Sequence, residues 1–388
     1  MEEREQEFLP FHRPWIGEEE IAEVCDTLRS GWLTLGPKTH RFEEKFAAYL
    51  GARHAVALSS CTAALHLALE ALGIGPGDEV ITTPYTFTAT VAAILYTGAR
   101  PVLADVMPDY PNIDPAQVAD KITERTRAII PVHFGGAPCD LDAIELLARR
   151  CGAAVVEDAA HALPARYRGR MIGARGKAVA FSFYAGKNIT TGEGGMLVTD
   201  DERLAEQVRV LRLHGISRDA WKRYSKEGSW YYEVTARGFK YNMTDINAAI
   251  GLHQLDRLAD FDRRRRRLVA RYNERLAPVR GIRLPAPPAY GESAWHLYVV
   301  EIEPEEASVS RAEVIEGLRR RGIGTSVHFI PIHLHPYYQR VLGCQAGDFP
   351  NATRHYEGAI SLPLFPAMTE GDVDRVAEAL IAIMGGKS

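Results

Sequence analysis

Short apolar runs alternate with helical patterns over residues 55–199, and this alternation constrains the fold more than any other feature of the chain. The runs are continuously apolar, as expected for strands buried on both faces of a parallel sheet. They cover residues 55–58, 79–82, 101–104, 128–132, 153–157, 179–183 and 196–199. Helical patterns over 62–72 and 144–150 lie between them. The sequence therefore predicts an α/β fold with a mostly parallel sheet.

A second, smaller domain is predicted after a long helical pattern. That pattern runs from Thr244 to Leu276, and the proline-rich segment 284–288 interrupts the sequence after it. Beyond the break, residues 296–302 are strand-like, and 310–320 and 370–384 are helical patterns. We therefore expect a large α/β domain over residues 1–280, with an N-terminal arm, and a small α+β domain over residues 281–388.

Two residues with opposite charges follow two of the predicted strands. Lys187 comes after the run 179–183 and enters a glycine-rich turn, and Asp158 ends the run 153–157. A lysine at the exit of a buried strand has an accessible neutral amine, which can form a Schiff base with an aldehyde cofactor. Because ligands bind at the carboxyl ends of such strands, Asp158 can meet the same cofactor and pair with its ring nitrogen. This pair predicts pyridoxal phosphate. The alternatives are a surface lysine and a helix N-cap.

A third segment predicts a phosphate site. A strand, the small residues Ser59 and Ser60, and an Ala/Leu-rich helical pattern follow one another. The free N–H groups at the start of such a helix bind anions, so Thr62 and Ala63 are candidate phosphate ligands, and Ser182 offers a further hydroxyl. Ordinary helix capping is the alternative. Phe87, after the next strand, offers an aromatic face for the cofactor ring.

In their order along nearly the whole chain, these segments resemble the DegT/StrS-type sugar-nucleotide aminotransferases, a family that depends on pyridoxal phosphate. Residues 30–37, 238–245 and 361–366 extend the resemblance. It implies the fold of pyridoxal-phosphate-dependent transferases of the aspartate aminotransferase type (fold type I), with a large and a small domain. It also implies a homodimer with shared active sites.

The resemblance assigns roles to individual residues. Lys187 would form the Schiff base with the cofactor, Asp158 would contact the pyridine nitrogen, and Phe87 would stack on the ring. The phosphate would be held by Thr62, Ala63, Ser182 and, from a second subunit, Asn242. His161 would lie beside the phenolic oxygen of the cofactor, and His328 is the first candidate for a substrate contact.

The implied reaction is a two-stage transamination. An amino group would pass from glutamate, which leaves as 2-oxoglutarate, to the keto group of a nucleotide-linked sugar. The enzymes that aminate C4 of UDP-4-keto-sugars are the most similar, which implies a place in amino-sugar and polysaccharide biosynthesis. Aminotransfer to a keto-inositol and a non-enzymatic, cofactor-binding regulatory role stay open. A dehydratase branch of this fold carries histidine at the lysine position, and Lys187 argues against it.

Other features narrow the class of protein. A formal net charge of -4 gives no pull toward nucleic acid or an anionic membrane. The arginine run 263–267 is flanked by aspartates in a helical pattern, which predicts a solvated or intersubunit face. His328, His333 and His335 lack the carboxylate or cysteine that would complete a metal site, so we expect none. The five cysteines include no Cys-x-x-Cys pair, and the acidic start of the chain is unlike a signal peptide, so we expect a cytoplasmic protein.

Overall fold

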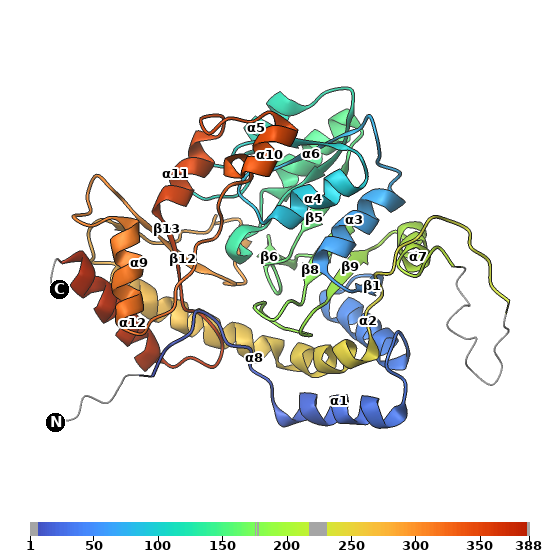
Figure 1. The fold of residues 1–388 in the computed structure, drawn as a ribbon, viewed down its shortest axis with the longest axis horizontal. Helices are drawn as coiled ribbons and strands as arrows, with labels where there is room; N and C mark the ends of the chain where they lie inside the picture. Colours follow the sequence, from blue (N-terminus) through green and yellow to red (C-terminus); the bar gives the residue numbers. More distant parts are fainter. Residues whose placement is uncertain (1–6, 175, 177, 217–230, 386–388) are drawn as a thin grey trace.

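The computed structural model describes residues 7–174, 176, 178–216 and 231–385. At its centre lies a seven-stranded sheet that helices cover on both faces (Figure 1). The strand order is β1-β9-β8-β5-β4-β2-β3. These strands are β1 (His54–Leu58), β2 (Glu79–Thr82), β3 (Arg100–Leu103), β4 (Thr126–Ile130), β5 (Ala154–Asp158), β8 (Ala178–Ser182) and β9 (Gly195–Thr199).

The sheet is mostly parallel, as predicted. All neighbouring strands from β3 to β8 run parallel, whereas β9 runs antiparallel to both β8 and β1. Each strand-like run within residues 55–199 corresponds to one strand of this sheet, with small shifts at the ends. Continuous apolar runs are required here because both faces of the sheet are covered.

Side chains of β8 point alternately to two apolar layers. Phe181 packs with residues of α2 (Pro37–Leu50) and α8 (Asp245–Leu276), and Ala180 packs with residues of α3 (Cys61–Ala71) and α7 (Glu202–Leu211). The remaining helices around this sheet are α1 (Glu18–Ser30), α4 (Thr88–Tyr96), α5 (Pro115–Lys121), the short η1 (Phe134–Gly136) and α6 (Leu141–Cys151). Of the helices in the described part of the chain, none combines the length and the apolar character that a bilayer crossing requires.

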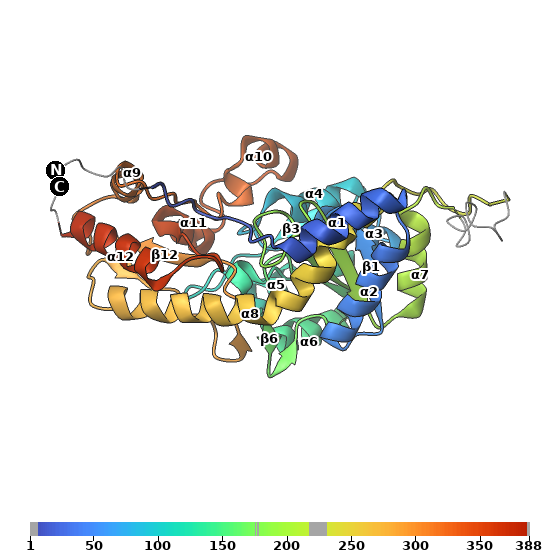
Figure 2. The same ribbon diagram turned by 90° about the horizontal axis from the view of Figure 1, so that it is seen from below.

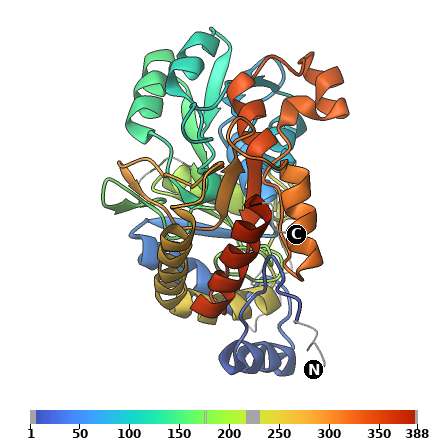
Figure 3. The same ribbon diagram turned by 90° about the vertical axis from the view of Figure 1, so that its left-hand side faces the viewer.

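A smaller antiparallel sheet lies at the C-terminal end of α8 (Figure 1), and the orange and red helices of this part face the viewer in Figure 3. Helices α9 and α12 pack on one another, and α12 also packs on α8. Leu268, Tyr272 and Leu276 of α8 belong to the apolar core of this part. Helix α8 contributes side chains to the apolar cores of both sheets and so joins the two parts of the chain. The domain boundary near residue 280 stays a prediction. The elements of this C-terminal part are β10 (Ile282–Arg283), β12 (Tyr298–Ile302), α9 (Arg311–Arg320), η3 (Ile332–Leu334), α10 (Pro336–Leu342), α11 (Pro350–Gly358), β13 (Ala359–Leu362) and α12 (Glu370–Met384). A third, three-stranded sheet has the order β11 (Gly291–Glu292), β6 (Arg166–Tyr167) and β7 (Arg170–Met171).

The N-terminal arm runs from the small sheet toward α1 (Figure 2). Leu9 forms a β-bridge with Ile323 and is buried in the core of the small sheet. The backbone N–H of Leu9 donates to the carbonyl of Gly322 (2.9 Å), and the N–H of Gly324 donates to the carbonyl of Leu9 (2.8 Å). The arm, predicted with the large domain, is thus anchored on residues of the C-terminal part.

The arginine run is not uniformly solvated, so the prediction of a solvated or intersubunit face is wrong for its middle residue. Arg265 is 1% exposed. Its Nη1 donates to the backbone carbonyls of Leu364 (2.9 Å) and Trp295 (3.2 Å). Its neighbours Arg264 and Arg266 instead pair with aspartates one turn earlier on α8. The helical period turns one residue of the run inward, where it ties α8 to the C-terminal part.

Candidate active site

A cavity of about 850 Å³ lies at the carboxyl ends of β5 and β8. These strands are neighbours in the sheet, so the segments that follow them lie side by side. The N-terminal arm and the segment 326–329 add further walls. The lining residues are Phe11, His12, Pro14, Ser60, Cys61, Thr62, Leu65, Thr86, Phe87, Ala89, Thr90, Val132, Asp158, Ala160, His161, Ser182, Tyr184, Ala185, Gly186, Lys187, Glu193, Gly194, His296, Ser326, His328 and Phe329.

Lys187 faces this cavity from a turn after β8. Its backbone N–H donates to the carbonyl of Tyr184 (2.9 Å), which closes the turn. Desolvation lowers the pKa of Lys187 to about 8, although Cys61 and Asp158 favour the charged amine. At pH 7, a lysine with this pKa is neutral in about one molecule in ten, against fewer than about one in a thousand at the usual pKa. The site therefore contains an amine that can act as a nucleophile or a base.

Asp158 ends β5 and is buried at the floor of the cavity. Thr90 Oγ1 donates to Asp158 Oδ2 (2.7 Å), and the backbone N–H of Ala160 donates to Oδ1 (3.1 Å). Burial raises the pKa of Asp158, whereas these two hydrogen bonds and the charge of Lys187 lower it. The donors also fix the direction of the carboxylate. A buried carboxylate oriented in this way can hold a proton on a ring nitrogen.

His161 has a defined hydrogen-bonding role. The backbone N–H of Gly135 donates to its Nδ1 (3.3 Å), so the neutral ring carries its proton on Nε2 and can donate it. Burial, followed by the charge of Lys187, places the pKa of His161 well below its usual value. The ring stacks with Phe329, with centroids 5.7 Å apart, and lies 4.3 Å from the ring of His296. His161 is therefore a neutral donor beside Lys187.

The start of α3 borders the cavity, but its two predicted residues differ. Thr62 lines the cavity, whereas Ala63 is buried and its N–H donates to Oγ of the N-cap residue Ser60 (3.1 Å). Ser182 lines the cavity from the end of β8. Strand β9 lies against the turn at Ser60, which precedes α3. This close approach requires glycine at position 195, because a Cβ there would be 2.3 Å from the carbonyl carbon of Ser60.

Two of the predicted cofactor contacts lie at or beyond the cavity wall. Phe87 lines the cavity, but its side chain is 59% exposed, and its ring centroid lies 6.0 Å from that of Phe329. Asn242 is absent from the wall of the cavity in its own chain. It forms a β-bridge with Leu58, and its Nδ2 donates to the carbonyl of Met243 (3.1 Å).

His328, His333 and His335 each have a different hydrogen-bond partner and do not form one cluster. His328 lines the cavity and shares a 2.8 Å hydrogen bond with Ser361 Oγ through Nδ1. Burial and the charge of Lys187 lower the pKa of His328 to about 4. His333 pairs with Thr353, and His335 pairs with the carbonyl of Ile330. Among the described residues, no group of three His, Cys, Asp or Glu side chains is arranged to hold a metal ion.

Several lining residues were not singled out from the sequence. His12 comes from the N-terminal arm, and no local pattern signals its approach to Lys187. Thr90 lies three residues after Phe87, but its hydrogen bond to Asp158, 68 positions away, is a tertiary contact that the local sequence does not reveal. Cys61 lies 4.0 Å from Asp158 through its Sγ.

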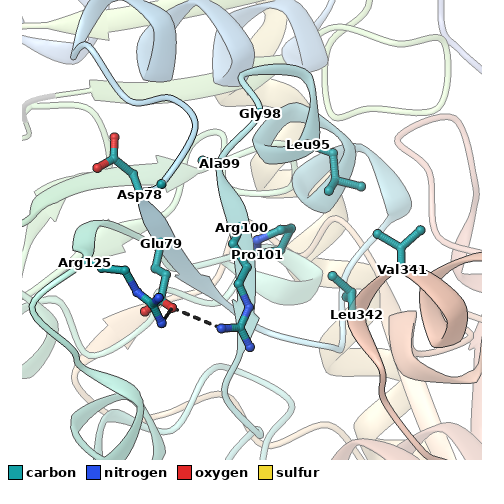
Figure 4. Close-up of a pocket in the computed structure, with 11 residues that line it drawn as sticks. Asp78, Glu79, Leu95, Gly98, Ala99, Arg100, Pro101, Arg125, Val341 and Leu342 are labelled. Carbon is teal, nitrogen blue, oxygen red and sulfur yellow. Dashed lines mark hydrogen bonds and ion pairs between the residues drawn. The ribbon is translucent and has the colours of Figure 1, made fainter.

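A second cavity, of about 300 Å³, lies at the opposite ends of β2 and β3 (Figure 4). Its charged groups are already paired: Glu79 Oε1 accepts from Arg125 Nη2 (2.7 Å) and from Arg100 Nη1 (3.2 Å). Leu95, Val341 and Leu342 supply apolar walls. Because this cavity contains no lysine or histidine, it does not offer the chemistry of the larger one.

The chain is similar in sequence to known aminotransferases and to a polysaccharide biosynthesis protein. The model of the DegT/DnrJ/EryC1/StrS aminotransferase family matches residues 14–381. The spore coat polysaccharide biosynthesis protein SpsC of Bacillus subtilis is 54% identical over 387 residues, which cover 100% of both chains.

Solved structures of aminotransferases are also similar to this chain. The PLP form of the putative sugar aminotransferase Spr1654 from Streptococcus pneumoniae is similar with a TM-score of 0.91 and 35% identity, covering 98% of this chain and 100% of that chain. PseC of Helicobacter pylori, an aminotransferase of pseudoaminic acid biosynthesis, is similar with a TM-score of 0.89 and 28% identity, covering 98% of this chain and 100% of that one.

The lowered pKa of Lys187 can be measured in cofactor-free protein. We expect its reaction with fluorodinitrobenzene, followed by peptide mass spectrometry, to rise with a midpoint near pH 8, because only the neutral amine reacts. Asp158→Asn removes a negative charge that favours the ammonium, so the midpoint should move to lower pH. Exposed lysines in the same digest are the internal control. A Lys187 profile identical to theirs would contradict the desolvated site.

Proposed function

The chain belongs to the DegT/DnrJ/EryC1/StrS aminotransferase family and is a sugar aminotransferase that depends on pyridoxal phosphate, and from this premise we propose its substrates and mechanism. It moves an amino group from glutamate to the keto group of a nucleotide-linked sugar. A UDP-4-keto-sugar is the favoured acceptor. The reaction runs in two stages, with glutamate entering and 2-oxoglutarate leaving before the sugar binds.

The observation that carries this proposal is the convergence of Lys187 and Asp158 on one cavity. A depressed pKa of about 8 gives the lysine a usable neutral amine, and the carboxylate is held by two hydrogen bonds. The residues fit the cofactor, because its aldehyde, ring nitrogen and phosphate each have a candidate partner on the wall. Those partners are Lys187, Asp158 and the Thr62–Ser182 side of the cavity.

The cofactor supplies an aldehyde and a ring that accepts electrons from the reacting carbon. Lys187 would hold the aldehyde, and its Nζ, once freed by the amino donor, would take a proton from the donor carbon and return one in the second stage. Asp158 would hold the ring nitrogen in its protonated form through its oriented carboxylate. His161 would donate a hydrogen bond from Nε2 to the phenolic oxygen.

The sugar site is proposed on the side of the cavity formed by the C-terminal part. His328 lines that side and, being neutral, can hydrogen-bond a sugar hydroxyl through Nε2, because Ser361 occupies Nδ1. A cavity of about 850 Å³ is within the size range of sites that bind small molecules. The similar Spr1654 structures are those of a putative sugar aminotransferase, which supports a sugar as the acceptor.

We propose a homodimer that shares its active sites. Apolar side chains at or near the mouth of the cavity are exposed in one chain: Phe87 is 59%, Tyr184 54% and Ile330 45% exposed. Exposed aromatic residues beside a functional cavity are typical of a surface that a partner covers. Asn242 would then reach the phosphate of the partner's cofactor. All five cysteines are free, which supports action in a reducing cytoplasm.

The first stage has a direct optical test. We expect the purified wild type, loaded with pyridoxal phosphate, to lose its yellow absorbance when glutamate is added and to regain it with a UDP-4-keto-pentose. Lys187→Ala should lose at least about 10³-fold in rate, because the group that moves the proton is gone. Lys121→Ala, an exposed lysine on α5, is the matched control. Bleaching without recovery by any keto-sugar would contradict the proposed acceptor.

Mixed dimers test the shared site. Lys187→Ala and Asn242→Asp subunits should each be nearly inactive alone, the second because a carboxylate repels the cofactor phosphate. After unfolding together and refolding, about a quarter of wild-type activity should return, because half of the dimers contain one intact site out of two. Thermal melting checks that each variant folds. No recovery of activity would place Asn242 at the site of its own chain.

A further inference from the structure

Two buried threonine hydroxyls form a chain that ends on Asp158. Thr90, in the first turn of α4, donates from Oγ1 to Asp158 Oδ2 (2.7 Å). Thr86, four residues earlier, places its Oγ1 2.8 Å from Thr90 Oγ1. Thr86 is 2% exposed and Thr90 is fully buried. The side chain of Asp158 is therefore linked, through Thr90, to a residue that lies farther along the same wall of the cavity.

The direction of both hydrogen bonds follows from the number of protons. A hydroxyl carries one proton and two lone pairs, and an ionised carboxylate only accepts. While Asp158 is ionised, the single proton of Thr90 is used on the carboxylate, so Thr86 is the donor in the contact between the two hydroxyls. A threonine in a helix can instead turn its hydroxyl toward a backbone carbonyl of the preceding turn. The hydrogen bond from Thr86 opposes that rotation and keeps the proton of Thr90 on Asp158.

The chain also acts on the charge of Asp158. Burial raises the pKa of Asp158, and the hydrogen bond from Thr90 is the largest of the effects that lower it. A donor that itself accepts a hydrogen bond is polarised, which strengthens its own bond by about 10–30%. Thr86 therefore strengthens the interaction that favours the carboxylate.

Other groups act on Asp158 from the elements packed around it. The backbone N–H of Ala160 donates to Oδ1 (3.1 Å), and Sγ of Cys61, at the start of α3, lies 4.0 Å from the same oxygen. Lys187, after β8, and His133, after β4, also lower the pKa of Asp158 electrostatically. Among the described residues, Oδ2 accepts a hydrogen bond only from Thr90. Loss of the threonine chain would leave this oxygen without a donor.

We propose that Thr86 and Thr90 are positioning residues for Asp158: their two hydroxyls keep its carboxylate ionised and oriented for the ring nitrogen of the cofactor. This inference rests on the proposed function, because it requires Asp158 to contact that nitrogen. A carboxylate with a lower affinity for the proton leaves it on the ring nitrogen, and the cofactor accepts electrons best in that form. Thr86 would thus influence the reaction through Thr90.

The first test uses cofactor-free protein. With ¹³C-labelled aspartate carboxyls, the signal lost in Asp158→Asn identifies Asp158, and its shift with pH gives the pKa. Thr90→Val keeps the shape and removes the hydroxyl, so it should raise this pKa by about 1–2. Thr86→Val should raise it by about 0.3–1, because the hydroxyl of Thr90 is then a weaker donor and can turn away. Thr90→Ser and Thr86→Ser should each restore most of the loss.

A double variant separates the chain from two independent effects. Because Thr86 acts through Thr90, Thr86→Val should have no further effect on the Asp158 titration once Thr90→Val is present. Thr88→Val is the matched control, since this threonine of the same helix pairs with Tyr338 and is absent from the cavity wall. Thr86→Val by itself tests the inference even if Thr90→Val does not fold.

The second test reads the ring nitrogen in protein loaded with pyridoxal phosphate labelled there with ¹⁵N. The ¹⁵N shift distinguishes a protonated from an unprotonated ring. We expect the protonated value in the wild type, a move toward the unprotonated value in Thr90→Val, and a smaller move in Thr86→Val. With glutamate, kcat should fall about 10-fold and about 3-fold respectively, with little change in KM.

Three results would count against these roles. An Asp158 titration in Thr86→Val equal to that of the wild type would overturn the inference, as would additive effects of Thr86→Val and Thr90→Val. A lower melting temperature with unchanged titration and ¹⁵N shift would mean that the hydroxyls are only structural. If Asp158→Asn leaves the ¹⁵N shift unchanged, the proposed contact of Asp158 with the ring nitrogen fails, while the titration still tests the threonine chain.

Discussion

The site depends on one constraint: an amine and a carboxylate must be kept out of water within one cavity. Asp158 ends β5, and Lys187 lies in the turn that follows the neighbouring parallel strand β8, so the pairing of these strands and the turn together bring the two residues to one cavity. Burial acts on them in opposite ways, because it lowers the pKa of the lysine and raises that of the aspartate. The hydrogen bonds from Thr90 and the backbone of Ala160 reduce this rise in the pKa of Asp158 without cancelling it, and they keep the carboxylate oriented. The two apolar layers of the sheet supply the rigid support for this arrangement.

The chemistry around Lys187 is dominated by neutral imidazoles. The pKa of His12 and that of His328 are each lowered to about 4, and burial places the pKa values of His161 and His296 well below the usual range. Four neutral rings add hydrogen-bonding atoms without adding positive charge beside the amine. Such a wall suits an uncharged polyhydroxylated group better than an anion. The two proposed contacts, His161 and His328, therefore divide one type of side chain between the cofactor and the sugar.

Much of this arrangement could be predicted from local sequence. The continuous apolar runs predicted the strands, and Asp158 and Lys187, which follow two of these runs, could be placed at one edge of the sheet. The contacts that join distant segments could not. Arg265 looks like its exposed neighbours in sequence, and its burial depends on carbonyls about 30 and 99 residues away. His12 lines the cavity because the arm that carries it is anchored at Leu9 on the small sheet. Ala63 stays a predicted phosphate ligand, and in this structure its N–H donates to Ser60 Oγ.

The most direct test of the central claim is to identify the lysine that holds the cofactor. Borohydride reduction of the enzyme loaded with pyridoxal phosphate attaches the cofactor permanently to that residue, and mass spectrometry of the tryptic peptides then locates it. The account predicts that the phosphopyridoxyl group is found on Lys187 at close to one per chain. Attachment to another lysine, or no attachment after loading, would contradict the assignment of Lys187 and, with it, the roles derived for Asp158 and the surrounding histidines.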